Sequence, residues 1–398
     1  MSSGATVRRE IRDYPFEVFR GDLPDELLQM VEHEKVSRVR LPGGRLVWLV
    51  LGYDEVSEVL TDVRFRRSGG PFDTGAEVTD GCPVRNLGMD GAAHAGLRRL
   101  AARAFTPRRI EAFRSRIQAI TDELLDAMVE RGSPGDLVAD LVVPLPAIVI
   151  SELLGVPAAD RERFAQWDTA MMAVDTHAVT ETADPTRAMR AYLGARLAEK
   201  RAAPGTDLLS AWVEAQADDP SLTDEEIIGL AVTVLVGGRE ISSISVGMRA
   251  LFQHPDVMQR LRADPGLIPP AVDELLRFTS LSPTFFELTV VAPVELGGVA
   301  LQAGDVVMPL PWAANRDPAK FPEPDLLRLD RPWGQHLTFG TGSHFCLGAA
   351  LGRMEVEIAI ATLLRRFPHL RPAVEIDELP WRHERINCGL KAFPVAWA

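Results

Sequence analysis

Cysteine is scarce in this sequence. Only three of the 398 residues are cysteines, at positions 82, 346 and 388. No two of them form a CxxC pair, so a zinc knuckle or a dithiol redox motif is not expected. An odd number of cysteines without regular spacing also argues against the disulfide framework of a secreted protein.

Positive charge and long apolar runs are also in short supply. Lysine and arginine together number 43 against 56 aspartates and glutamates, which gives a formal net charge of −13. Nucleic-acid binding needs a basic footprint, so no nucleic-acid partner is expected. The N-terminal segment, MSSGATVRREIRDYPFEVF, lacks the apolar run of a signal peptide or membrane anchor. We expect a cytoplasmic protein without a membrane partner.

The composition that remains is that of a large globular enzyme. Hydrophobic residues make up 46% of the chain and charged residues 25%, which argues against disorder. A chain this long can bury most of its apolar surface and enclose a large cofactor. Stretches rich in β-forming residues lie near 36–51, 285–310 and 373–397, and segments with helical spacing lie between them. We predict an α+β fold, mainly α-helical, with residues 1–398 as a single domain that contains a small β-rich subdomain.

The most informative segment is a glycine-rich loop that contains Cys346. Residues 339–348 read Phe-Gly-Thr-Gly-Ser-His-Phe-Cys-Leu-Gly, and Ala349–Phe367 then shows helical spacing of apolar residues. A cysteine just before a helix start is poised to ionise, because the helix dipole and free N–H groups favour the thiolate. Gly340 and Gly342 allow tight backbone conformations and a close approach to a flat cofactor. The alternative is an inert, buried cysteine beside an ordinary loop.

The ten-residue string resembles the heme-binding signature of the cytochrome P-450 family. The likeness extends over nearly the whole chain, and it implies heme b as cofactor, with Cys346 as the axial thiolate ligand of the iron. In the same loop it implies that Phe339, Gly340 and Gly348 contact the cofactor. Glu274 and Arg277 are similar to the family's Glu-x-x-Arg pair, which has a folding role and lies on one helix face.

The resemblance also implies partners for the two heme propionates. His94 and Arg98 are four residues apart on one predicted helix face, and His344 in the cysteine loop is a further donor. Buried carboxylates need paired donors, because an isolated buried charge is costly. The family's usual propionate-binding arginine falls on Leu288, so either the heme has one donor fewer or another residue substitutes. The alternative for His94 is a surface histidine on a basic helix.

The sequence departs from the family in a segment that usually completes a charged triad. An arginine is expected soon after the last proline of the stretch 321–325, where it joins the Glu-x-x-Arg pair. This sequence has Leu326 and Leu327 there, and Arg328 comes late.

Leu222–Phe252 is predicted to be the long helix on the distal side of the heme. The family motif there is a small residue, glycine, any residue, an acid and threonine, whereas residues 237–241 read Gly-Gly-Arg-Glu-Ile. The resemblance makes Glu240 the acid of a catalytic proton relay. Ile241 stands in place of the threonine and has no hydroxyl, so Ser242 is the candidate to substitute for it. The alternatives are helix packing for the two glycines and a surface position for Glu240.

The predicted substrate pocket is apolar and carries few charges, which suits an aromatic or peptide-like ligand. Its expected contacts come from the distal helix, from the segment before residue 288 and from a turn near the C-terminus: Leu235, Gly238, Ile241, Thr284, Phe285 and Ile386. The stretch Val374–Trp397 is similar to the tail of a family member that couples the rings of a cyclic dipeptide. A shared strand pairing explains that likeness equally well.

Three functions remain open on the sequence. The first is monooxygenation of a macrolide, terpenoid or other apolar metabolite, and the second is C–C or C–N coupling of an aromatic secondary metabolite such as a cyclic dipeptide. The third is a non-catalytic heme sensor, which an intact cysteine loop and a possible acid relay disfavour. No flavin or iron–sulfur motif occurs, so electrons are expected from a separate ferredoxin with its reductase. Basic residues that could dock an acidic ferredoxin are Arg99, Arg103, Arg108 and Arg109.

Overall fold

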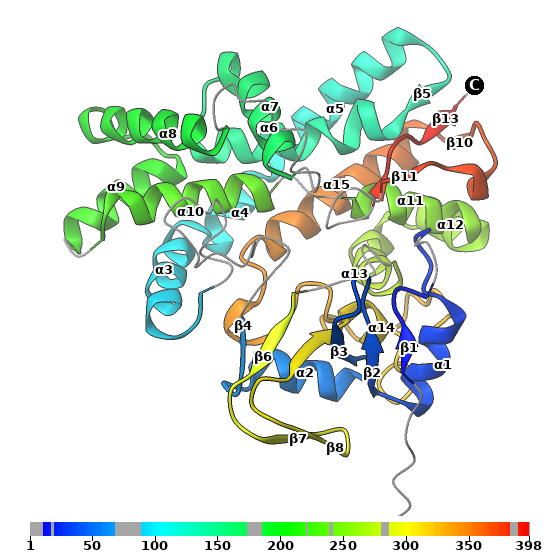
Figure 1. Cartoon of the computed structure of the whole chain (residues 1–398). Helices are drawn as coiled ribbons and strands as arrows, with labels where there is room; N and C mark the ends of the chain where they lie inside the picture. Colours follow the sequence, from blue (N-terminus) through cyan, green and yellow to red (C-terminus); the bar gives the residue numbers. More distant parts are fainter. Residues whose placement is uncertain are drawn as a thin grey trace, which may run out of the picture.

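A computed structural model describes most of the chain, namely residues 11–16, 20–67, 89–172, 185–219, 222–238, 242–279, 286–382 and 389–397. Its α-helices are spread along the whole sequence (Figure 1). They are α1 (Asp25–His33), α2 (Tyr53–Thr61), α3 (Gly91–Ala104), α4 (Pro107–Ala112), α5 (Arg114–Arg131), α6 (Pro144–Leu154), α7 (Arg161–Met172), α8 (Pro185–Ala202), α9 (Leu208–Asp218), α10 (Asp224–Gly237), α11 (Ser243–Gln253), α12 (Pro255–Ala263), α13 (Ile268–Phe278), α14 (Pro311–Ala314) and α15 (Ala349–Arg366).

The strands are short. They are β1 (Arg12–Asp13), β2 (Val36–Arg40), β3 (Leu46–Val50), β4 (Phe65–Arg67), β5 (Gly135–Asp136), β6 (Leu288–Val290), β7 (Val294–Leu296), β8 (Val299–Leu301), β9 (Val306–Pro309), β10 (Arg371–Pro372), β11 (Trp381–Arg382), β12 (Gly389–Leu390) and β13 (Pro394–Ala396). The largest sheet runs in the order β1-β2-β3-β9-β6-β4 and lies beside the helical body (Figure 1). The α+β fold with a mainly helical body is therefore confirmed.

The large sheet joins segments that are far apart in the sequence. Strand β3 pairs parallel with β9, and β9 pairs antiparallel with β6. Strand β6 then pairs antiparallel with β4, with Arg67 opposite Leu288. Apolar side chains of these strands, among them Val50, Val290 and Val307, pack with Val56 and Val59 of helix α2 in one apolar cluster. This pairing brings the N-terminal third of the chain beside the segment that precedes the cysteine loop.

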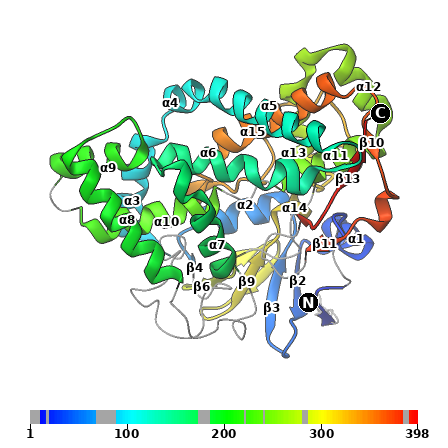
Figure 2. The same cartoon turned by 90° about the horizontal axis from the view of Figure 1, so that it is seen from above.

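Helix α15 runs through the middle of the helical body. Eleven of its side chains are buried, and eight of these belong to a core cluster that also includes residues from α5, α11 and α13. A helix that is apolar on most of its faces is expected to lie in the core. Seen from above, α15 passes between these neighbours (Figure 2). Its N-terminal end, which follows the cysteine loop, is therefore held by packing on several sides.

Two helix boundaries are set by short sequence patterns. The side chain of Thr223 accepts from the Glu226 N–H while Glu226 accepts from the Thr223 N–H, which is a capping box. Helix α3 ends at Ala104, and Pro107 opens α4, whose N-cap Thr106 accepts from the Arg109 N–H.

The predicted continuous helix Leu222–Phe252 is wrong in its extent. Helix α10 ends at Gly237, with Gly238 as its C-cap, and α11 begins at Ser243. Two successive glycines weaken a helix, because glycine has a low helix propensity. Residues 239–241 lie outside the described part. Among the described helices, none is long and apolar enough to cross a bilayer.

Candidate cofactor and active site

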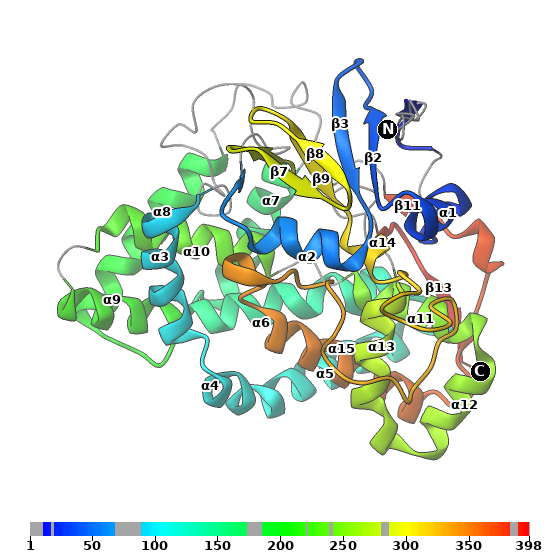
Figure 3. The ribbon, with the colours of Figure 1, turned by 90° about the horizontal axis from the view of Figure 1, so that it is seen from below.

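The cysteine loop folds back on itself before helix α15. The Cys346 N–H donates to the Phe339 carbonyl at 2.8 Å, and the Gly340 N–H donates to Leu337 at 2.8 Å. Gly340 has φ +69° and Gly342 has φ +71°, in the left-handed region that favours glycine. A Cβ at Gly342 would lie 2.8 Å from the Leu60 carbonyl oxygen at the end of α2. The glycines therefore let the loop turn tightly and pack against α2, beside which it runs (Figure 3).

The thiol of Cys346 is accessible although protein surrounds it densely. The residue is exposed, yet burial raises the pKa of its thiol, while the Gly348 N–H and the charges of Arg98 and Arg353 act to lower it. The sequence predicted a lowered pKa from the following helix start. In the structure the Gly348 N–H acts in that direction, but desolvation of the charged form has the larger effect. A thiol in this position can reach a group that occupies the adjacent space.

Basic side chains gather beside the cysteine. The rings of His94 and His344 stack, with centroids 4.0 Å apart and planes at 20°. Arg98 donates to the carbonyl of Phe345, the residue before the cysteine. His344 Nε2 lies 2.9 Å from a carboxylate oxygen of Asp90. The predicted donors His94, Arg98 and His344 are thus brought together within one cluster.

Arg67, which no sequence motif indicated, acts electrostatically on this cluster. Burial lowers the pKa of Arg67 to about 10, and burial together with the charges of Arg98 and Arg67 lowers the pKa of His94. Burial and the charge of Arg67 lower the pKa of His344 to about 4. Asp90 is the carboxylate that opposes these shifts. Two arginines and two histidines around one carboxylate form a site that favours bound anions.

The donor set fits heme. The exposed Cys346, whose thiolate can act as an axial ligand, lies next to half-buried cationic groups, which is the combination that an iron macrocycle with two carboxylates requires. The space beside Gly348 is open, since a Cβ atom at this position would have no heavy atom within 4 Å. Phe339 is half-buried, with the Arg353 guanidinium 4.8 Å from its ring centroid.

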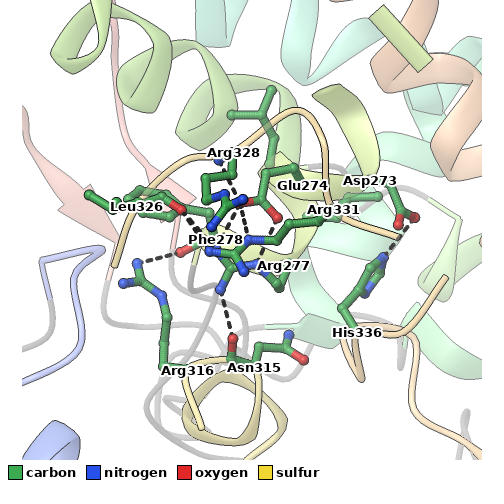
Figure 4. Close-up of polar contacts among 12 residues, drawn as sticks. Asp273, Glu274, Arg277, Phe278, Asn315, Arg316, Leu326, Arg328, Arg331 and His336 are labelled. Carbon is green, nitrogen blue, oxygen red and sulfur yellow. Dashed lines mark hydrogen bonds and ion pairs between the residues drawn. The ribbon is translucent and has the colours of Figure 1, made fainter. Parts of the chain in front are cut away.

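A buried charge network surrounds Glu274 of helix α13 (Figure 4). Glu274 accepts two hydrogen bonds from Arg277, at 2.7 and 2.9 Å. Arg331 Nε donates to the same carboxylate at 3.0 Å, and its other nitrogens donate to backbone carbonyls. The predicted pair is therefore present, and Arg331 is its second arginine. Arg328, which the sequence suggested as a late candidate, reaches Glu274 only through its backbone N–H, at 2.9 Å.

A second network, which the sequence analysis did not find, supports the loop. His336 Nε2 lies 3.1 Å from the Asp273 carboxylate, and Arg353 donates to the same oxygen at 3.1 Å (Figure 4 shows the His336–Asp273 contact). The Gly334 N–H donates to the other oxygen at 2.7 Å. These contacts tie the segment before the cysteine loop to helices α13 and α15. Only Asp273 and Arg353 lie on regular helices, so spacing alone gave no signal for the group.

The distal residues are placed less favourably than expected. Leu235 is 2% exposed and packs in the main core cluster. A Cβ on Gly238 would lie 2.7 Å from Ile150 of helix α6, whereas one on Gly237 would meet nothing within 4 Å. Gly238 thus serves helix packing, and Gly237 is the glycine that faces open space. Ser242 is buried, with Arg382 Nη2 3.5 Å from its hydroxyl. The other predicted active-site residues lie outside the described part: Glu240, Ile241, Thr284, Phe285 and Ile386.

Comparisons with known proteins agree with this site. Residues 267–380 match the family model for cytochrome P-450. Nocardicin C N-oxygenase from Nocardia uniformis subsp. tsuyamanensis is 41% identical, with 98% of this chain and 100% of that protein covered. Mycinamicin IV hydroxylase/epoxidase from Micromonospora griseorubida is 40% identical, with 98% and 99% covered. A crystal structure of a cytochrome P-450 with biaryl coupling reactivity superposes with a TM-score of 0.86 at 36% identity, covering 98% of this chain and 100% of that one.

The chain belongs to the cytochrome P-450 family. It is a heme-thiolate monooxygenase of the secondary-metabolism type, and the family's heme iron carries an axial cysteine thiolate, for which Cys346 is the matching residue. These relatives give no support to the likeness between the C-terminal stretch and a cyclic-dipeptide-coupling member. The activities in their names differ from one another, so the family does not by itself fix the substrate.

Proposed function

We propose that this enzyme uses O2 and electrons from a separate ferredoxin to oxidise a small aromatic secondary metabolite. The exposed Cys346 beside a half-buried basic cluster carries the proposal, because together they provide a heme site. When bound, the heme supplies the oxygen chemistry. The protein residues bind the substrate, orient it and control protons.

The reaction is either oxygen insertion or oxidative coupling. Ile241 replaces the hydroxyl residue that the family uses for proton transfer. The loss of this hydroxyl disfavours a proton relay that depends on a protein hydroxyl. The hydroxyl of Ser242 is a poor substitute, since it is buried next to Arg382 and Gly389. We therefore favour C–C or C–N coupling, in which the product loses a pair of hydrogens. The relative with biaryl coupling reactivity supports this choice, whereas the mycinamicin relative supports hydroxylation of a macrolide.

The proposed heme contacts begin with the two propionates. His94 and Arg98 project from helix α3, and His344 projects from the cysteine loop, so the cluster receives donors from two separate segments. In this proposal Phe339, Gly340 and Gly348 border the macrocycle beside Cys346. Glu240 keeps its proposed role in proton transfer.

The double variant His94→Ala/Arg98→Ala is expected to lose heme at least about tenfold faster than wild type, because charge-assisted hydrogen bonds to the propionates are removed. Transfer of heme to apomyoglobin measures the rate. The carbon monoxide spectrum should still show thiolate ligation, since Cys346 is untouched. Arg99→Ala is the control on the same helix, because Arg99 is exposed. Wild-type retention in the double variant would remove these residues from the propionate site.

The proposed ferredoxin surface lies on α3 and α4. Arg99 and Arg103 are exposed and one helical turn apart, and Arg108 is exposed at the start of α4. Arg109 is only half-exposed and lies beside Glu152 and Asp207 in a surface pocket of about 410 Å³. The exposed arginines are therefore the better candidates for an acidic partner, which long-range attraction would steer to this face.

Turnover with a ferredoxin, its reductase and a substrate library, read by mass spectrometry, tests the proposed function. The library contains aromatic peptides, cyclic dipeptides, macrolides and terpenoids. We expect an aromatic substrate to give a coupled product that lacks a pair of hydrogens. A product that gains one oxygen supports the hydroxylase alternative, and no turnover of any candidate supports a heme sensor.

Ile241→Thr separates the two reactions in the same assay. If the enzyme couples rings, threonine should leave coupling intact or divert some substrate to hydroxylated product. A rise in native turnover of more than about tenfold would match recovery of an acid relay. That result would show that Ile241 is a handicap in ordinary oxygen insertion and would contradict the coupling proposal.

A further inference from the structure

Leu288 lacks a charge, but its neighbour across the sheet has one. Strands β4 and β6 are antiparallel, and Arg67 pairs directly with Leu288. Leu288 itself is 5% exposed and packs in the apolar cluster beneath the sheet. The side chain of a residue that pairs with position 288 therefore leaves the sheet close to the point where the side chain of residue 288 leaves it.

The strand register also fixes which way the side chains point. Directly opposed residues of an antiparallel pair lie on the same face of the sheet, with Cβ atoms about 4.5–5.5 Å apart. Phe65 and Val290, the next pair on that face, are both buried. Arg66, which lies between Phe65 and Arg67 in strand β4, is exposed. Arg67 therefore projects from the buried face that position 288 also uses. Its long side chain can reach a volume that an arginine at position 288 would reach.

Contacts of Arg67 lead toward the basic cluster. Its backbone N–H donates to Asp90 Oδ2 at 2.8 Å, and the other oxygen of Asp90 lies 2.9 Å from His344. The guanidinium lies over the Phe286 ring, 4.4 Å from its centroid. Asp90 thus joins the end of β4 to the cysteine loop, and Phe286 limits the directions that the Arg67 side chain can take.

Electrostatics place Arg67 near the predicted propionate donors. Its positive charge contributes to the lowered pKa of His94, so the two groups lie within effective Coulomb range. Burial lowers the pKa of Arg67 itself, to about 10. An anion bound in the cluster favours the charged forms of His94 and Arg67, and it would therefore raise the pKa values of both groups.

We infer that Arg67 binds a heme propionate and takes over, from the neighbouring strand, the donor role that Leu288 cannot fill. The inference rests on the heme site of the proposed function. Because a guanidinium presents parallel N–H groups to a carboxylate, it can bind the propionate through two hydrogen bonds. The guanidinium would then reach the propionate from strand β4 instead of from strand β6.

Relocating the charge tests this inference directly. Heme loss from the holoenzyme to apomyoglobin is measured for Arg67→Leu, for the matched control Arg66→Leu and for the double variant Arg67→Leu/Leu288→Arg. We expect Arg67→Leu to lose heme at least about tenfold faster than wild type, since a charge-assisted contact is removed. Arg66→Leu should match wild type because Arg66 lies on the exposed face. The double variant should recover much of the lost retention, because the guanidinium returns from the opposite strand.

The spectrum of the reduced carbon monoxide complex distinguishes the possible failures. Arg67→Leu should keep the thiolate spectrum of wild type, which shows that Cys346 and the loop are intact. If Arg67→Leu and Arg66→Leu lose heme at the wild-type rate, Arg67 does not bind the propionates. If wild type itself binds no heme, the proposed function fails before Arg67 is at issue. Should Arg67→Leu not accumulate, Arg67→Gln is measured with the same expectation, and Arg67→Lys should retain heme better than Arg67→Gln.

Discussion

Replacing Cys346 with alanine is expected to abolish the red-shifted Soret band of the reduced carbon monoxide complex. That band reports thiolate ligation of the iron, and alanine offers no atom that can bind iron. Phe339 and Gly348 stay in place, so the loop loses its ligand without losing its shape. The absorption spectrum of the reduced protein with carbon monoxide measures the effect.

Cys82→Ala is the matched control, because it removes a cysteine that lies well outside the cysteine loop. It should leave the spectrum unchanged. A histidine-type spectrum in the wild-type protein would contradict the assignment of Cys346. So would a wild-type spectrum in the Cys346→Ala variant.

Removing the Glu274 carboxylate is expected to cost about 3–5 kcal/mol of unfolding free energy, the range for breaking a buried ion pair from one side. Glu274 is 4% exposed and Arg277 is 3% exposed. Both Arg277 and Arg331 donate to this carboxylate. In Glu274→Ala the two guanidiniums keep their charge in a nearly water-free place and lose their common partner. Urea unfolding followed by circular dichroism measures the loss.

Glu111→Ala provides the comparison for a surface ion pair. Glu111 accepts from Arg114 at 2.7 Å on the outside of the helical body. Exposed pairs of this kind contribute about 0–1 kcal/mol, so this variant should unfold near the wild-type midpoint. If Glu274→Ala were as stable as Glu111→Ala, the buried network would not hold the segment that precedes the cysteine loop.

The sequence was informative wherever the chemistry is local. The cysteine loop, the i, i+3 pair of Glu274 and Arg277, and the i, i+4 pair of His94 and Arg98 all depend on short spacings. A helix or a tight turn converts such spacings into geometry almost without help from the rest of the chain. The capping box at Thr223 and the helix start at Pro107 depend on local patterns in the same way.

Sequence reasoning was weaker where a local rule competed with tertiary packing. The helix start after Cys346 was expected to lower the thiol pKa, but desolvation by the surrounding protein outweighs it. The distal helix was expected to continue through residues 237–238, but it ends there. Of the two glycines, Gly238 is used for close packing against Ile150, which depends on where helix α6 lies.

The identity of several partners depended on the tertiary structure. Arg331 completes the Glu274 network from a segment without regular structure. At the family's usual spacing, the positions where this arginine was expected hold Leu326 and Leu327. Arg67 enters the basic cluster because β4 pairs with β6, a contact between distant parts of the chain. By itself the sequence indicated the ligand and the cofactor class, because the short cysteine loop resembles the family's heme-binding signature. It indicated the mainly helical α+β fold because the apolar spacing of each segment is a local property. Only the tertiary structure decided which charges meet around the cofactor site, because burial and strand pairing between distant segments set those distances.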